Sequence, residues 1–183
     1  MDYLDKLEEE SLRVIMEAYN NLNNPVVLFS GGKDSAVLLH LVKKALQIQD
    51  YDDFLNIMHV DTGHNFQEVL DFRDSITPKV IVRKVEDTIK KHNIKIGPKE
   101  SRNRLQSTTL LEALDEFKFD AAFGGGRRDE DAARSKERFF SFRNSEGKWD
   151  PEAQRCEIWN LFNCHRHENS GEGFRVFPIN NWA

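Results

Sequence analysis

Cysteine is scarce in this chain, and Cys156 and Cys164 are the only two in 183 residues. Two cysteines cannot build the disulfide framework of a small secreted domain, so we expect a reducing, cytoplasmic location. No apolar run approaches the roughly 20 residues that cross a bilayer. The N-terminus also lacks the basic and then apolar layout of a signal peptide. The sequence therefore predicts no membrane partner.

An excess of basic residues is also absent. The 26 Lys and Arg residues are outnumbered by 31 Asp and Glu residues, which gives a formal net charge of −5. Because non-specific nucleic-acid binding relies on positive charge, we expect no nucleic-acid partner and only local anion sites. Hydrophobic residues make up 39% of the chain and include 13 Phe, enough for the core of a single domain over residues 1–183.

Apolar runs of strand length alternate with segments of helical periodicity. The runs predict strands near residues 26–29, 54–60, 80–82, 119–123 and 174–177, and the periodicity predicts helices over residues 3–22, 37–45, 64–75 and 105–117. This alternation is typical of an α/β fold, a mostly parallel sheet with helices on both faces. Residues 144–183 are polar and rich in turn residues, so we expect a loop-rich extension there. The chain stops at Asn180-Asn181-Trp182-Ala183 with no capping element after it, and we expect it to be a fragment of a longer protein.

The most informative segment is the turn between the strand at residues 26–29 and the helix that follows it. Two consecutive glycines let the backbone approach a ligand closely, and a helix start offers free N–H groups to an anion. One lysine and two serines add a charge and two hydroxyl donors. The turn therefore predicts a phosphate-binding loop, and the plainer alternative is a strand-to-helix turn with a surface lysine. Its residues are Ser30, Gly31, Gly32, Lys33, Asp34 and Ser35.

The spacing in this loop excludes two common nucleotide-binding motifs. A Walker A loop needs a hydroxyl residue directly after its lysine, but Lys33 is followed by Asp34. The Rossmann fingerprint needs G-x-G-x-x-G, which is absent. The sequence Ser-Gly-Gly-Lys-Asp-Ser instead resembles the pyrophosphate-binding loop of the N-type ATP pyrophosphatases. In that superfamily the loop holds the β- and γ-phosphates while a nucleophile attacks the α-phosphate.

Asp61 follows the second predicted strand, at the edge of a parallel sheet where ligands bind. Its carboxylate is a candidate for contact with a ribose hydroxyl or with magnesium. The alternative is that Asp61 only caps the next helix.

A glycine run that contains Gly125 follows the strand at residues 119–123 and leads into Arg127 and Arg128. Guanidinium groups bind oxyanions through paired hydrogen bonds, so these two arginines are candidates for binding sulfate or phosphate. The alternative for the charged segment up to residue 143 is a solvated helix with ion pairs between neighbouring turns.

Several longer segments match one family in the same order. They are Val-Asp-Thr-Gly at 60–63, Phe-Arg-Asp at 72–74, Phe-Asp-Ala-Ala-Phe-Gly-Gly at 119–125, Arg-Arg-Asp-Glu at 127–130, Lys-Glu-Arg at 136–138, Ser-Phe-Arg at 141–143, Trp-Asp-Pro at 149–151 and Arg-Val-Phe-Pro at 175–178. With them the chain resembles the small, catalytic subunit of the two-subunit bacterial ATP sulfurylase from its first helix to its last residue. That family usually has a bulkier apolar residue at the position of Gly31.

The resemblance implies an adenine-nucleotide α-hydrolase-like fold and sulfate adenylyltransferase activity. Sulfate would attack the α-phosphate of ATP to give adenylyl sulfate and pyrophosphate. The resemblance also implies Mg²⁺ and a GTPase large subunit as partner. Lys33 and the loop backbone would hold the pyrophosphate, while Arg127 and Arg128 would bind sulfate or the developing charge.

Two other interpretations stay open. A related phosphoadenylylsulfate reductase needs a nucleophilic cysteine in a Glu-Cys-Gly-Leu-His context, which neither Cys156 nor Cys164 has. The other is a non-catalytic ATP-binding module of the same superfamily. The segment Cys164-His165-Arg166-His167, taken with Cys156, fits no standard zinc spacing, so we expect no metal site there.

Overall fold

The computed structural model describes residues 2–51, 55–77, 79–95, 97, 102–130, 132–154, 156–157 and 172–182. The described residues form a six-stranded sheet in the order β3-β2-β1-β4-β6-β5. All neighbouring strands run parallel except β5 and β6, which are antiparallel. The strands are β1 (Pro25–Leu28), β2 (Asn56–Asp61), β3 (Ile81–Lys84), β4 (Ala121–Phe123), β5 (Phe140–Arg143) and β6 (Gly173–Val176).

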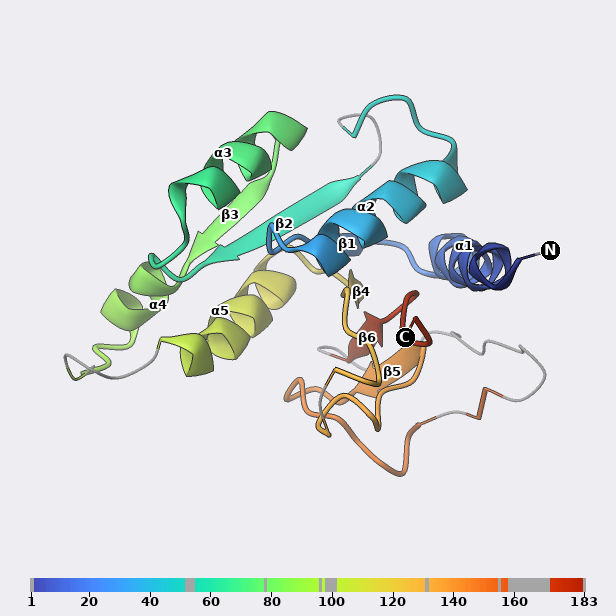
Figure 1. Ribbon diagram of the computed structural model, residues 1–183. Helices are drawn as coiled ribbons and strands as arrows, with labels where there is room; N and C mark the ends of the chain where they lie inside the picture. Colours follow the sequence, from blue (N-terminus) through green and yellow to red (C-terminus); the bar gives the residue numbers. More distant parts are fainter. Residues whose placement is uncertain are drawn as a thin grey trace.

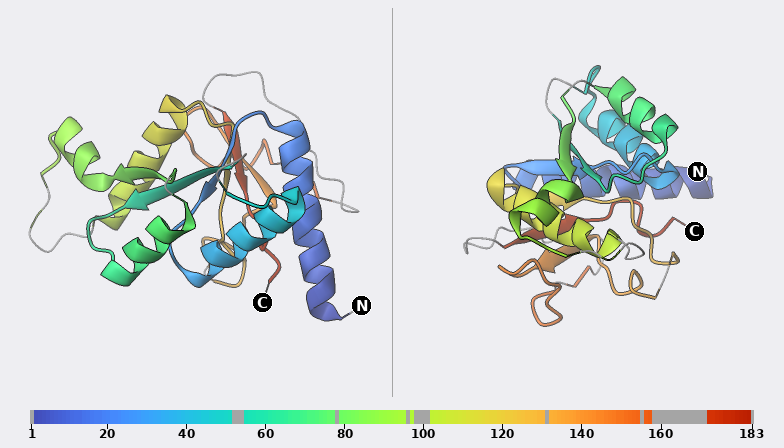
Figure 2. Two further views of the ribbon diagram at one scale, coloured as in Figure 1. Left: turned by 90° about the horizontal axis from the view of Figure 1, so that it is seen from above. Right: turned by 90° about the vertical axis from the view of Figure 1, so that its left-hand side faces the viewer.

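Helices cover both faces of this sheet. They are α1 (Tyr3–Asn21), α2 (Lys33–Leu46), α3 (Gln67–Ile76), α4 (Val85–Lys91) and α5 (Asn103–Glu116). In Figure 1 and Figure 2, α2 and α3 lie on one side of the sheet, and α4 and α5 lie on the other. The predicted α/β fold is therefore confirmed. None of the helices in the described part of the chain is long and apolar enough to cross a bilayer.

The two faces of β1 explain why helices are needed on both sides. Val27, and Phe29 just after the strand, pack with residues of α1 and α2 in the larger core cluster. Val26 points the other way and packs with Ala113 and Leu114 of α5 in a smaller cluster. Burying one such side chain stabilises the fold by about 1.5–3 kcal/mol, so a strand that is apolar on both faces requires a helix layer on each.

The strand order reverses next to β1. The chain builds β2 and β3 on one side of β1 and then returns to place β4 on the other side. Loops that leave neighbouring strands in opposite directions open a crevice at the carboxyl ends of those strands. Residues 29–32 follow β1 and residues 124–127 follow β4, so both segments lie at this crevice.

The last strand, β6, lies between β4 and β5. Phe174 and Val176 point into the larger core cluster. Because successive side chains of a strand alternate between its faces, Arg175 projects from the opposite face. Ser141 of β5 pairs with Arg175, so Arg143, two residues further along β5, shares that face.

Two expectations about local structure were wrong. The solvated helix considered for the segment after Arg128 does not form, because its described residues make turns that lead into β5. Glu137 in this segment pairs with Arg143 rather than with a residue one helical turn away, so tertiary contacts replace helical ones. Helix α4 was not expected, because its single run of seven residues is too short to show a clear periodicity.

We predict that Asp120→Ala destabilises the fold. The Asp120 carboxylate accepts hydrogen bonds from the backbone N–H groups of Asn23, at 2.7 Å, and Asn24, at 3.0 Å, and so ties the start of β1 to the start of β4. Hydrogen bonds to a charged acceptor contribute about 1.5–3 kcal/mol, and we expect a loss of this order in urea unfolding. Asp115→Ala is the control, because the Asp115 carboxylate forms an exposed ion pair with Lys118. Equal losses for the two variants would contradict the prediction.

Candidate functional site

A cavity of about 440 Å³ lies at the crevice where the strand order reverses. One side of the cavity is apolar and another side carries arginines, so the cavity can hold a molecule that has both a non-polar part and an anionic part. Residues from β1, β2, α2, α5, the turn after β4 and the strands β5 and β6 contribute to it. The lining residues are Leu28, Phe29, Ser30, Asp34, Ser35, Met58, Val60, Gln106, Ser107, Leu110, Gly124, Gly125, Gly126, Glu130, Arg134, Arg143, Arg175 and Phe177.

The predicted phosphate-binding loop forms part of the cavity wall. The Ser35 hydroxyl donates to the Gly32 carbonyl at 2.9 Å, and the Ser30 hydroxyl lies 3.1 Å from the Ser35 hydroxyl, so side chains close the loop on itself. Gly31 has a φ of 79°, in the left-handed region that favours glycine. A Cβ at Gly31 would also lie 2.4 Å from Cγ1 of Val69. A bulkier residue at this position therefore requires a shift of the backbone and of Val69.

Helix α2 starts directly after this loop. Gly32 is its N-cap and provides no side-chain hydrogen bond, so the helix start presents backbone donors rather than a capping oxygen. Lys33 does not line the cavity. Its side chain is 77% exposed, and its Nζ lies 3.2 Å from Oδ1 of Asp34. Lys33 is thus an exposed cation at the loop, on a long side chain that can move to a bound anion.

The glycine run after β4 lines the cavity beside the loop. A Cβ on Gly125 would lie 2.9 Å from the carbonyl carbon of Asp34 and 3.0 Å from the backbone nitrogen of Ser35. These are main-chain atoms, which cannot move aside as the end of a flexible side chain can. Only glycine therefore permits this approach, which brings residue 125 and the phosphate-binding loop together.

Arg127 and Arg128 follow the glycines but do not line the cavity. The Arg127 guanidinium donates to the carbonyl of Trp182 at 3.2 Å, and its Nε lies 3.5 Å from Oδ1 of Asp34. Arg128 donates to the carbonyl of Glu137 at 3.1 Å, and its guanidinium lies over the Phe139 ring. Their proposed role in binding sulfate stays a prediction.

Asp61 lies at the end of β2 and organises the loop that follows. Its Oδ1 accepts hydrogen bonds from the backbone N–H of Gly63, at 2.7 Å, and from the side-chain amide of Asn65, at 2.9 Å. Asp61 does not cap α3, whose N-cap is residue 66. The neighbouring His59 is buried, with its Nδ1 2.8 Å from the carbonyl of Phe29, and burial lowers the pKa of its imidazole.

Arg134, Arg143 and Arg175 line the cavity, and the sequence analysis did not assign a site to Arg143 or Arg175. The signal that identifies these two is the alternation Phe-Ser-Phe-Arg at residues 140–143 and Gly-Phe-Arg-Val at residues 173–176. In each case an arginine alternates with side chains that enter the core, which puts the charge on the inner surface of the cavity.

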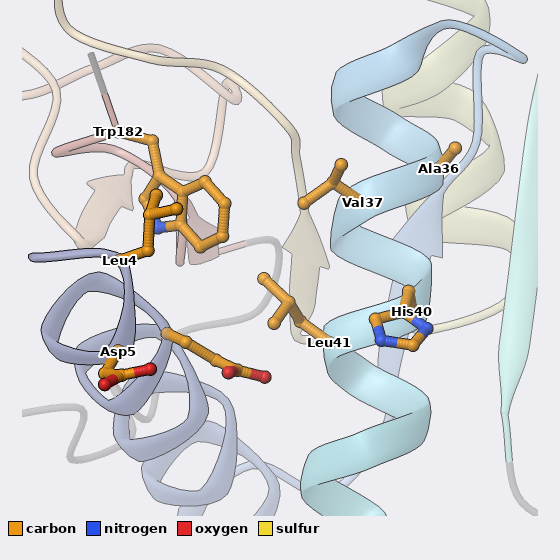
Figure 3. A pocket seen from close by; sticks show the side chains of 8 residues that line it. Leu4, Asp5, Ala36, Val37, His40, Leu41 and Trp182 are labelled. Atoms are coloured by element: carbon orange, nitrogen blue, oxygen red, sulfur yellow. The ribbon is translucent and has the colours of Figure 1, made fainter. Parts of the chain in front are cut away.

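A second cavity, of about 520 Å³, lies between α1, α2 and Trp182 (Figure 3). Its described lining includes two carboxylates, Asp5 and Glu8, and neither Lys nor Arg, so it is poorly suited to a phosphate or sulfate.

Within the described ranges, no group of three or more His, Cys, Asp or Glu side chains is arranged to hold a metal ion. Cys156 is exposed, and residues 164–167 lie outside the described residues.

Sequence relatives agree on one family. The chain matches the phosphoadenosine phosphosulfate reductase domain over residues 24–183. The sulfate adenylyltransferase subunit 2 of Mycobacterium bovis (strain BCG / Pasteur 1173P2) is 48% identical over 187 residues, which are 100% of this chain and 59% of that protein. The protein of the same name from Mycolicibacterium gilvum is 49% identical with the same coverage. The chain therefore spans 59% of the length of these relatives.

Solved structures agree with the fold. FMN adenylyltransferase of Candida glabrata, in complex with ATP, superimposes with a TM-score of 0.61 at 14% identity and covers 97% of this chain and 50% of its own chain. The adenine-nucleotide α-hydrolase-like fold that the sequence predicted is thus confirmed, and so is the resemblance to the small ATP sulfurylase subunit. The matched domain includes the phosphate-binding loop, the glycine run and the strands that carry Arg143 and Arg175. This chain belongs to the phosphoadenosine phosphosulfate reductase domain family.

Proposed function

We propose that this chain is the nucleotide-binding part of a sulfate adenylyltransferase. The observation that carries the proposal is the 48% identity, over the whole chain, to proteins named sulfate adenylyltransferase subunit 2. The loop beside the cavity and the ATP complex of the Candida glabrata adenylyltransferase support ATP as one substrate. The arginines of the cavity support an oxyanion, here sulfate, as the other.

The reaction needs no covalent intermediate on the protein, because sulfate itself is the nucleophile. One sulfate oxygen attacks the α-phosphorus of ATP and forms a new P–O bond. The bond between the α-phosphorus and the oxygen that bridges to the β-phosphate breaks, and its electron pair leaves with pyrophosphate. The products are adenylyl sulfate and pyrophosphate. The protein contributes by orienting the two anions and by stabilising the charge that develops between them.

The cavity suggests how ATP lies. The loop, with Ser30, Gly32, Lys33 and the start of α2, holds the pyrophosphate part. The apolar side of the cavity accepts the base, since planar rings bind between apolar side chains. Asp61 does not itself line the cavity, and it would contact the ribose through its second carboxylate oxygen, because Oδ1 accepts from Gly63 and Asn65. The side chains of that apolar wall are Leu28, Met58, Val60 and Leu110.

The carboxylates Asp34 and Glu130 line the cavity and are the groups that would hold Mg²⁺, with Asp34 exchanging its contacts with Lys33 and Arg127 for the ion. Mg²⁺ is typically held by one or two carboxylates together with phosphate oxygens of the substrate and water. When bound, the ion would reduce the negative charge of the triphosphate. The family resemblance supports this ion, and it supports a GTPase large subunit as the partner, in agreement with the word subunit in the names of the relatives.

We infer a cytoplasmic location from the scarcity of cysteine.

A reductase is the main rival, because the matched domain is named after one. A reductase of this family needs a nucleophilic cysteine near the substrate. Cys156 is exposed and does not line the cavity. The 48% identity to proteins named sulfate adenylyltransferase subunit 2 is what favours the adenylyltransferase.

Mass spectrometry of the products tests the proposal. The complete protein would be incubated with ATP and sulfate, with and without its partner subunit. We expect adenylyl sulfate and pyrophosphate in equal amounts. Formation of sulfite from a sulfonucleotide would indicate the reductase, and binding of ATP without any product would indicate a non-catalytic module.

We predict that Lys33→Ala weakens binding of a non-hydrolysable ATP analogue by about ten- to a hundredfold, because a charge-assisted contact contributes about 1.5–3 kcal/mol. Isothermal titration calorimetry measures this change. Lys44→Ala is the matched control, since Lys44 lies near the other end of α2 and pairs with Glu8. An unchanged dissociation constant for Lys33→Ala would mean that the loop is only a structural turn.

We also predict that Gly125→Ala lowers both stability and ATP binding. The new methyl group would meet the main chain of Asp34 and Ser35 at about 3 Å, and overpacking of this kind costs about 1–3 kcal/mol. Gly124→Ala is the comparison, because its methyl group would meet a side chain, the Phe177 ring, rather than the main chain. Thermal melting and analogue titration measure the two effects. A smaller effect at Gly125 than at Gly124 would show that the close backbone approach is not required.

A further inference from the structure

We propose that Arg175, supported by Arg143 and Arg134, binds the sulfate dianion in the cavity; this inference rests on the proposed function. The sequence alone predicts that Arg127 and Arg128 bind the sulfate. The proposal instead assigns this role to arginines of the cavity, two of which lie on β5 and β6.

Position is the first argument. Arg134, Arg143 and Arg175 line the same cavity as Ser30 and Ser35 of the phosphate-binding loop. An anion held there lies beside the site proposed for the phosphates of ATP. Arg127 and Arg128 are instead engaged with the C-terminal turn. Arg134, Arg143 and Arg175 already line the cavity, whereas Arg127 and Arg128 would have to leave these contacts to reach it.

The pairing of the arginines is the second argument. Both carboxylate oxygens of the buried Glu137 lie close to one nitrogen of Arg143, at 2.9 and 3.1 Å, so the charge of Arg143 is balanced within the protein. Among the described residues, the Arg175 side chain forms no hydrogen bond. Arg175 is thus held beside a neutralised pair with its guanidinium donors available to a ligand.

Electrostatics agree with this geometry. Burial, together with repulsion from Arg143, lowers the pKa of the Arg175 guanidinium well below its usual value, to about 10, and Glu137 offsets part of this effect. The group is still protonated at neutral pH. A lowered pKa means that folding disfavours the charged form, so at any pH below about 10 this charge destabilises the fold. A bound dianion would supply the missing counter-charge.

The test uses the complete protein, assembled with its partner subunit, and measures sulfate-dependent release of pyrophosphate. We expect Arg175→Met to raise the KM for sulfate by about tenfold or more, the effect of losing one charge-assisted contact. The KM for ATP should change by less than about twofold, because the proposal assigns the phosphates to the loop at residues 30–35 and not to Arg175. The KM for sulfate of Arg175→Lys should lie between the values for Arg175→Met and the wild type, because lysine keeps the positive charge but lacks the planar guanidinium. Arg13→Met on the exposed side of α1 is the control and should leave both constants unchanged.

Thermal melting separates this role from a structural one and does not depend on turnover. In chloride buffer, Arg175→Met should melt at or above the wild-type temperature, because it removes a buried and unbalanced charge. Low millimolar sulfate, compared with chloride at equal ionic strength, should raise the melting temperature of the wild type but not of Arg175→Met. Any general salting effect of sulfate appears in both proteins and cancels.

Several results would overturn the proposal. One is an unchanged KM for sulfate in Arg175→Met, and another is a rise confined to the KM for ATP, which would make the arginines a phosphate site. A sulfate-specific rise in Arg127→Lys or Arg128→Lys with none in Arg175→Met would return the sulfate to the first two arginines. If the wild type releases no pyrophosphate with sulfate, the proposed function fails. The melting comparison then still decides whether Arg175 binds an oxyanion. If sulfate raises the melting temperatures of the wild type and Arg175→Met equally, Arg175 does not bind one.

Discussion

The insertion of β6 between β4 and β5 is the constraint on which the rest of the structure depends. Gly124 donates its backbone N–H to the carbonyl of Val176 at 2.8 Å, and Phe177 donates to the carbonyl of Phe139 at 2.8 Å. One short strand thus fixes the glycine run on one side and the turns before β5 on the other. The cavity exists because segments from residue 28 to residue 177 are held together at this strand.

The site is built from groups that do not favour stability by themselves. Gly31 adopts a left-handed conformation, Gly125 allows a main-chain contact, and Arg175 carries a charge in a half-buried place. The anionic ligand that we propose for this cavity would account for each of them, because it would bring negative charge and need a close approach of the backbone. Functional sites commonly keep such groups at the expense of stability. The net charge of −5 does not oppose this, because a local cluster of arginines sets the potential inside a cavity.

Arg127 and Arg128, which follow the glycine run, contact the C-terminal turn. Arg127 contacts the carbonyl of Trp182, and the backbone N–H of Arg128 donates to the carbonyl of Asn180. Trp182 in turn donates its indole N–H to the hydroxyl of Ser11 on α1. These contacts join α1, the turn after β4 and the chain after β6. Arg127 and Arg128 therefore hold the wall that carries the glycine run, whether or not they also reach the substrate.

The sequence by itself determined the fold class, the position of the glycine loop between β1 and α2, and the family, because these depend on local patterns. The run of residues 26–29 and the loop at residues 30–35 each lie within one short segment, so spacing alone identifies them. The sequence could not determine which arginines face the cavity. Arg127 and Arg128 follow the glycine run directly, whereas Arg143 and Arg175 are far apart in the chain and meet only when β5 and β6 pair. The side on which each arginine projects depends on strand register and on what packs against the other face. Only the tertiary structure decides this, because register is fixed by contacts between distant segments.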